Sequence, residues 1–174
     1  MADKRFMQLL EDLKREYKPQ PLGFGGINAD YLLLLEHYFQ DVGSELQKPD
    51  VDMVRSSTLL WLIAMRALDG IQVTSYEQLF KDIEDLHCRK NSGYAGIGAT
   101  DHWANFRMAT WFGVTPLVGC LVRMTDKFIR IRNLTKNPAA DQVNENIKDT
   151  LFDMAIYALI AICLLEEGQV QYAA

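Results

Sequence analysis

Three carboxylates recur at intervals of four residues where a strongly apolar stretch of the chain begins. They are Glu145, Asp149 and Asp153, within NENIKDTLFDMAIYALIAICLLEE. On a helix each four-residue step turns by about 40°, so the three acids follow one face. Acids this close repel one another, and at the edge of a core they are costly unless paired. A divalent cation, for which hard carboxylates are suited, would remove both costs, and so would salt bridges to arginine.

A fourth acid, Asp126, stands in the preceding apolar stretch, PLVGCLVRMTDKFIRIRNL. Arg123 and Arg130 share its helical face, so a solvated row of salt bridges worth about 0.2–0.5 kcal/mol per pair is one interpretation. The other is that Asp126 faces the later acids across a metal site. Arg123, Arg130 or Arg132 could instead neutralise those acids. The residue pattern leaves the metal site and the salt bridges equally open.

Basic, amide and aromatic residues earlier in the chain could form the other half of a site. HCRKNSGYAG places cations before glycines that let the backbone approach a ligand, and HWANFR adds a further cation, an amide and three rings. Cations for phosphates, amides for a base edge and rings for stacking are typical of a nucleotide pocket. A helix end followed by core aromatics is the alternative, which spacing does not exclude. The residues concerned are Arg89, Lys90, Asn91, His102, Trp103, Asn105, Phe106 and Arg107.

Several other function classes are not expected. His87 and Cys88 are neighbours, so on a helix they point about 100° apart and form no catalytic dyad. The formal net charge is −5 and no Lys/Arg block occurs, which argues against nucleic-acid binding. The apolar run Met154–Leu165 is shorter than the roughly 20 residues that span a bilayer. Three widely spaced cysteines argue against disulfides or a zinc site and favour a cytoplasmic location.

The elements that must position these residues are helical, since apolar residues recur with a helical period nearly everywhere. We expect a single all-α domain over residues 1–174, a bundle of about seven helices joined by short connections. Thr74 and Glu77 resemble a capping box, and Pro116 suits a first helical turn. The expected helices cover residues 6–13, 28–46, 51–68, 75–90, 101–112, 116–136 and 144–167, with a flexible loop at Asn91–Thr100.

Four segments, CRKNSGYAG, WANFR, LVRMTDKFIRIRNL and ENIKDTLFDMAIYAL, resemble phage-encoded MazG-like proteins of the all-α nucleoside triphosphate pyrophosphohydrolase superfamily. The resemblance covers Tyr76–Glu166. It implies MazG-like catalytic helices in residues 71–174, with residues 1–70 as an added N-terminal helical layer. It also implies a homodimer or homotetramer in the cytoplasm, the host's if the chain is phage-encoded. The apolar stretches Leu59–Met65 and Met154–Leu165 are consistent with an intersubunit core.

The activity that this resemblance implies is metal-dependent cleavage of a nucleoside triphosphate to its monophosphate and pyrophosphate. The substrate would be a (d)NTP, such as dGTP or dATP in a MazZ-type enzyme of the phage nucleotide pool. The chain departs from the family pattern at Lys127, where a second acid is expected, and Glu36, Glu84 or Asp85 could supply it. The alternative is a catalytically degenerate protein that binds nucleotides or acts as a scaffold.

The resemblance, together with the patterns above, assigns a role to each candidate residue. Mg²⁺ or Mn²⁺ would be held by Asp126, Glu145, Asp149 and Asp153, and catalysis would rest on Asp126, Lys127, Glu145 and Asp149. The (d)NTP would be bound by Lys90, Asn91, Tyr94, Asn105, Arg107 and Arg130. No nucleic-acid or membrane partner is expected.

Overall fold

The computed structural model describes residues 4–17, 29–46, 53–71, 75–96, 100–137 and 146–172. Within these ranges the chain forms seven α-helices, one 3-10 helix and no strand, so the predicted all-α class is confirmed. None of the described helices is both long and apolar enough to cross a bilayer. The elements are α1 (Lys4–Glu16), α2 (Ala29–Glu45), α3 (Met53–Ile71), α4 (Tyr76–Ala95), α5 (Ala104–Arg107), η1 (Met108–Phe112), α6 (Pro116–Lys136) and α7 (Ile147–Tyr172).

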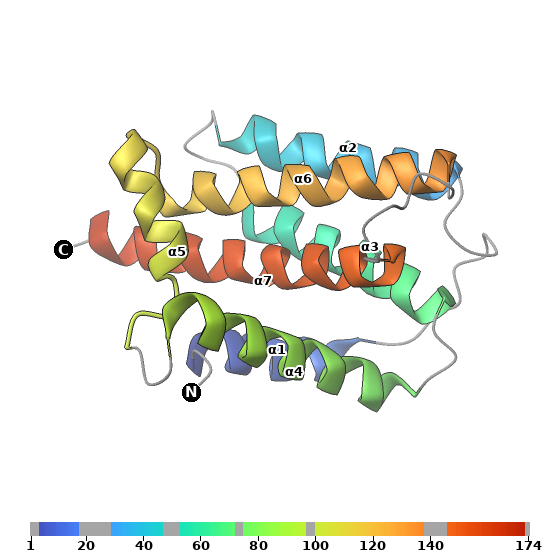
Figure 1. Cartoon of the computed structure of the whole chain (residues 1–174), viewed down its shortest axis with the longest axis horizontal. Coiled ribbons are helices and arrows are strands. Elements are labelled where there is room, and N and C mark those ends of the chain that lie inside the picture. The colour runs from blue at the N-terminus through green and yellow to red at the C-terminus, as the bar shows by residue number, and fades with distance from the viewer. Residues whose placement is uncertain are drawn as a thin grey trace.

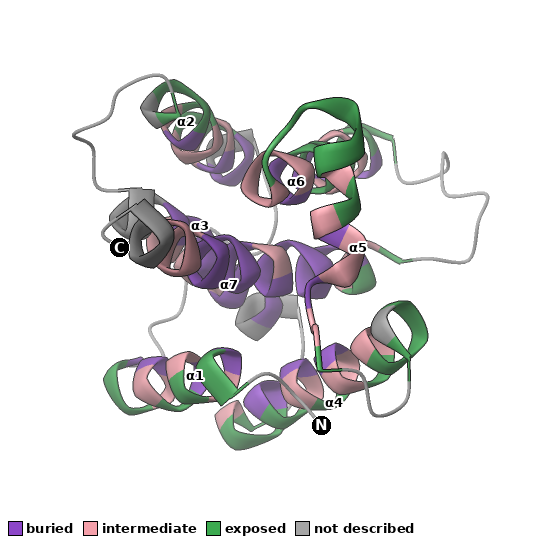
Figure 2. Ribbon diagram, turned by 90° about the vertical axis from the view of Figure 1, so that its left-hand side faces the viewer, coloured by how far each residue is buried: buried purple, intermediate pink, exposed green. Residues whose placement is uncertain are grey.

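The long helices stack as three layers of two (Figure 1). α3 and α7 form the middle layer, α2 and α6 cover one side of it, and α1 and α4 cover the other (Figure 2). α7 is central because its sequence is apolar all round: every residue from Leu151 to Leu164 is buried except the half-buried Tyr157. The stretch whose first half carries the acids is thus the core of the bundle.

The first 70 residues do not form a layer of their own, contrary to the sequence-based expectation. α1 packs beside α4, and α3 packs beside α7 (Figure 2). α2 packs against α3 and meets α6 through the stacked rings of Phe39 and Phe128. The physical reason is that α3 carries apolar residues on several faces and is therefore drawn to the centre. The stretches Leu59–Met65 and Met154–Leu165 pack in the same middle layer of one chain, so they no longer indicate an intersubunit core.

α4 is longer than expected, and this extension matters for the site. Ser75 rather than Thr74 supplies its N-cap, accepting a hydrogen bond from the backbone N–H of Gln78 at 3.2 Å. The helix continues through the predicted loop to Ala95 and ends at Gly96, whose φ of 90° suits glycine. Asn91 and Tyr94 therefore lie on α4, one and two turns beyond His87.

A tight corner joins α5 and η1 to α6. Gly113 adopts a left-handed φ of 76°, Thr115 caps α6 by accepting the N–H of Val118 at 3.2 Å, and Pro116 occupies its first turn as expected. One turn later, a Cβ added to Gly119 would lie 2.8 Å from the Cβ of Ala109 in η1. The absence of a side chain at Gly119 thus allows η1 to rest on α6.

Replacing Gly119 by alanine is therefore expected to lower the free energy of unfolding by about 1–3 kcal/mol, the usual cost of overpacking. Gly43→Ala is the matched control, because no atom lies within 4 Å of a Cβ built there. It should raise stability by about 0.5–1 kcal/mol, as expected for glycine replaced by alanine within a helix. Urea unfolding measures both values, and a Gly119→Ala protein as stable as Gly43→Ala would refute the close contact.

Candidate functional site

A pocket lies between α4, α5 and α7, on the side of the middle layer that α4 covers. Four of the six residues predicted to bind substrate line it, namely Lys90, Asn91, Tyr94 and Asn105. Helical spacing explains the assembly, because α4 and α7 each contribute residues at positions i, i+3, i+4 and i+7. The other lining residues are His87, His102, Trp103, Phe106, Asp153, Ile156, Tyr157 and Ile160.

Asp153 forms the charged centre of this pocket. Its side chain is only 4% exposed, and both of its oxygens are engaged by lysines. Lys90 of α4 pairs with Oδ1, and Lys127 of α6 pairs with Oδ2 at 2.7 Å. Two ammonium groups around one carboxylate leave a net charge of about +1, which favours an anionic ligand. The pairing also explains how a carboxylate can stand in the core.

The four predicted metal ligands are not brought together by the described part of the chain. Asp126 on α6 and Asp149 in the first turn of α7 are exposed, Asp153 is buried between the two lysines, and Glu145 lies outside the described residues. No group of three His, Cys, Asp or Glu side chains suited to a metal occurs among the described residues. A divalent cation at Asp153 would also meet two ammonium groups, so the residues described there do not fit one.

The proposed substitutes for the missing acid do not complete a metal group either. Glu36 lies on α2, and Glu84 and Asp85 lie on α4, without joining a described cluster of metal-binding side chains. Lys127, named as a catalytic candidate at the position where an acid was expected, is one of the two partners of Asp153. Its ion pair gives the lysine at this position a structural role.

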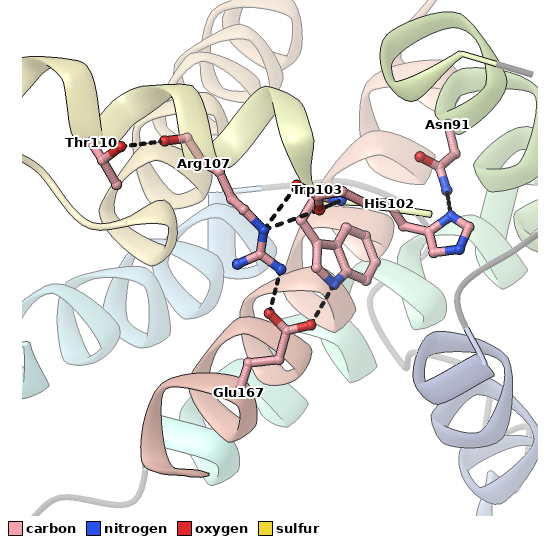
Figure 3. Close-up of polar contacts among 7 residues, drawn as sticks. Asn91, His102, Trp103, Arg107, Thr110 and Glu167 are labelled. Atoms are coloured by element: carbon pink, nitrogen blue, oxygen red, sulfur yellow. Dashed lines mark hydrogen bonds and ion pairs between the residues drawn. The ribbon is translucent and has the colours of Figure 1, made fainter. Parts of the chain in front are cut away.

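Besides Asp153, the pocket is lined by amide, imidazole and phenol groups. The Asn91 amide nitrogen lies 3.0 Å from His102 Nδ1. Figure 3 shows this contact between the two side chains. Tyr157 contributes its phenol from α7. Burial, reinforced by the charge of Asp153, raises the pKa of Tyr157 to about 12, so the phenol stays protonated and can donate a hydrogen bond.

The pKa of Tyr157 has a consequence for stability at alkaline pH. An unfolded tyrosine loses its proton near about pH 10, whereas the folded chain holds this proton until about pH 12. The unfolded state therefore binds fewer protons in this window, and the free energy of unfolding should fall as pH rises from 10 towards 12. Urea unfolding at several alkaline pH values should show a shallower fall for Tyr157→Phe. Tyr94→Phe, whose ring is 60% exposed, is the control and should keep the wild-type slope.

Two arginines predicted to bind substrate have protein partners. Arg107 pairs with Glu167, as Figure 3 shows, and also with Asp101. It is not among the residues that line the pocket. Arg130 donates from Nε to Thr150 Oγ1 at 3.3 Å. The Arg107 contact with Glu167 joins α5 to α7, and the Arg130 contact joins α6 to α7. Their binding of substrate stays a prediction.

Sequence reasoning missed three residues of this region: Tyr157, Asp101 and Glu167. Tyr157 was detectable, because it follows Asp153 by four positions and so lies on the same helical face. Glu167 carried no comparable signal. It lies at the end of an apolar run, and its partners are more than 50 residues away.

Among the comparisons with known proteins, one family model matches part of the chain. Residues 111–165, which run from η1 through α6 into α7, match the family described as nucleotide modification associated domain 1. The match covers less than half of the chain and includes Lys127, Asp153 and Tyr157. No curated protein and no solved structure matches the chain.

Proposed function

We propose that the pocket between α4, α5 and α7 binds a nucleotide. The observation that carries the proposal is the convergence of Lys90 and Lys127 on one buried carboxylate, at the wall of a pocket lined by rings and amides. Positive charge beside aromatic surface suits a ligand with phosphates at one end and a base at the other. The family match supports the same ligand class, since its description concerns nucleotides.

Lys90 is the residue proposed to bind the phosphates. It lines the pocket and its side chain is 38% exposed, so its ammonium can turn from Asp153 to a ligand. Lys127 is 20% exposed, is not a lining residue and remains on Asp153. The carboxylate is therefore still neutralised when Lys90 engages a phosphate.

The nucleoside is proposed to lie against the α5 side of the pocket. Asn91 and Asn105 offer amide groups to a base edge, and the His102 imidazole adds a further polar group. Tyr94 is 60% exposed, so its ring can turn over a bound base without leaving a packed core.

Hydrolysis of a bound (d)NTP to its monophosphate and pyrophosphate is the second candidate function. The resemblance to MazG-like proteins motivates it, and so do the carboxylates of Asp126 and Asp149, neither of which forms an ion pair with a described residue. The described acids alone do not form a binding site for Mg²⁺ or Mn²⁺. We therefore assign no reaction step to a metal.

Calorimetric titration with each of the four dNTPs, first in EDTA and then with Mn²⁺, tests both candidates. Nucleotide binding predicts saturable heat with at least one dNTP in EDTA. Hydrolysis predicts pyrophosphate and monophosphate in the Mn²⁺ samples, lost in Asp149→Asn but not in Asp12→Asn on α1. The binding proposal would be abandoned if no dNTP produced heat under either condition.

A further inference from the structure

The α5 wall of the pocket depends on contacts outside itself. α5 spans only four residues, and no side chain caps its N-terminus at Trp103. A single helical turn is not stable alone, because nucleation of a helix is unfavourable. Yet this turn and the two residues before it supply His102, Trp103, Asn105 and Phe106 to the pocket. Tertiary contacts must therefore fix where these side chains lie.

One carboxylate, that of Glu167 on α7, holds both ends of this turn. Its Oε1 accepts a hydrogen bond from the indole N–H of Trp103, just before α5, at 3.0 Å. Its Oε2 accepts a hydrogen bond from Nη2 of Arg107, at the end of α5, at 2.8 Å. Figure 3 shows the two contacts reaching the same side chain. Asp101 closes the arrangement by accepting from Arg107 Nε at 3.0 Å and from the Trp103 backbone N–H at 3.0 Å.

Glu167 lies on the same helix as the buried core segment of α7. It stands three residues beyond Leu164, where the buried segment of α7 ends. Through its contacts with Trp103 and Arg107, the Glu167 side chain ties α5 to the central helix α7. The result is visible at Trp103, which is 2% exposed although it lies at the edge of a short turn.

We propose that Glu167 is a positioning residue that sets the shape of the pocket by fixing α5. The consequence for ligand affinity rests on the proposed nucleotide binding, whereas the positioning itself does not. Both carboxylate oxygens are required, because each accepts from a different donor. Glutamine has one carbonyl oxygen and can serve only one of the two.

The test uses Trp103 as a reporter. The chain has three tryptophans, so a Trp61→Phe/Trp111→Phe background leaves Trp103 alone. Without ligand, Glu167→Ala should raise the acrylamide quenching constant of Trp103 by about twofold or more, as expected for local opening, with Glu167→Gln between it and wild type. Glu166→Ala is the matched control. It removes an ion pair from the same turn of α7, but that pair joins α1 through Arg5.

A second measurement avoids the substitution of the buried Trp61. Hydrogen exchange in the otherwise natural chain should be faster over residues 100–112 in Glu167→Ala than in Glu166→Ala. With dNTPs, Glu167→Ala should weaken binding by about tenfold, which corresponds to roughly 1.4 kcal/mol. Equal quenching and equal exchange in the two variants would overturn the proposal. Faster exchange in Glu167→Ala, together with a wild-type chain that binds no dNTP, would support the positioning role and reject nucleotide binding.

Discussion

Removing both ammonium groups beside Asp153, in a Lys90→Met/Lys127→Met variant, should lower the free energy of unfolding by about 3–5 kcal/mol. The carboxylate is 4% exposed and would be left in the core without a counter-charge. Each single replacement should cost clearly less, because the remaining lysine still pairs with Asp153. Urea unfolding at neutral pH gives all three values.

Two further variants separate this effect from a general loss of lysine. Lys81→Met/Lys136→Met removes exposed lysines from the same two helices, α4 and α6, and should change stability by less than about 0.5 kcal/mol. Adding Asp153→Leu to the first variant removes the unpaired charge and should recover most of the loss. A triple variant no more stable than the double one would contradict the burial cost assigned to Asp153.

Lys90→Met should weaken dNTP binding by about 10- to 100-fold, which corresponds to the roughly 1.5–3 kcal/mol of a charge-assisted hydrogen bond. Only ligands that carry phosphates should lose affinity, so the affinity for the deoxynucleoside should change little. Calorimetric titration with a dNTP, its monophosphate and the deoxynucleoside measures this dependence. Lys81→Met is the control on the same helix.

Two other results for Lys90→Met would contradict phosphate binding by Lys90. An equal loss for the deoxynucleoside and the dNTP would show that Lys90 shapes the pocket rather than binds phosphate. Unchanged dNTP affinity in Lys90→Met would place the phosphates away from the ion pair and contradict the orientation proposed for the ligand.

The sequence predicts the helices well because helical periodicity and capping are local. Thr115 and Pro116 mark the start of α6, and the apolar run after Asp153 marks the core helix. Four residues predicted to bind substrate line one pocket, although their role in binding stays a prediction: Lys90, Asn91, Tyr94 and Asn105. The glycines of NSGYAG, however, wrongly indicated a loop at Asn91, since helical packing outweighs the weak preference of glycine for loops.

The pairing of Asp153 with two lysines could not be predicted from the sequence, for a physical reason. Its lysine partners stand 63 and 26 positions away, on different helices, and only the packing of α4 and α6 against α7 brings them to one carboxylate. From the sequence alone, a row of acids along one helix is as consistent with a metal site as with ion pairs to basic side chains. Glu167 is similar, because its effect on α5 arises from contacts 60 and 64 positions away.

A crystal structure of the chain with a non-hydrolysable dNTP and Mn²⁺ tests the central claim most directly. We predict electron density for the nucleotide between α4, α5 and α7, with phosphates at Lys90 and the base between Tyr94 and the side chains of Asn91 and Asn105. The anomalous signal of Mn²⁺ would show at once whether Asp126 or Asp149 binds a cation beside the phosphates. A nucleotide bound elsewhere, with Lys90 and Lys127 still closed on Asp153 above an empty pocket, would contradict the account.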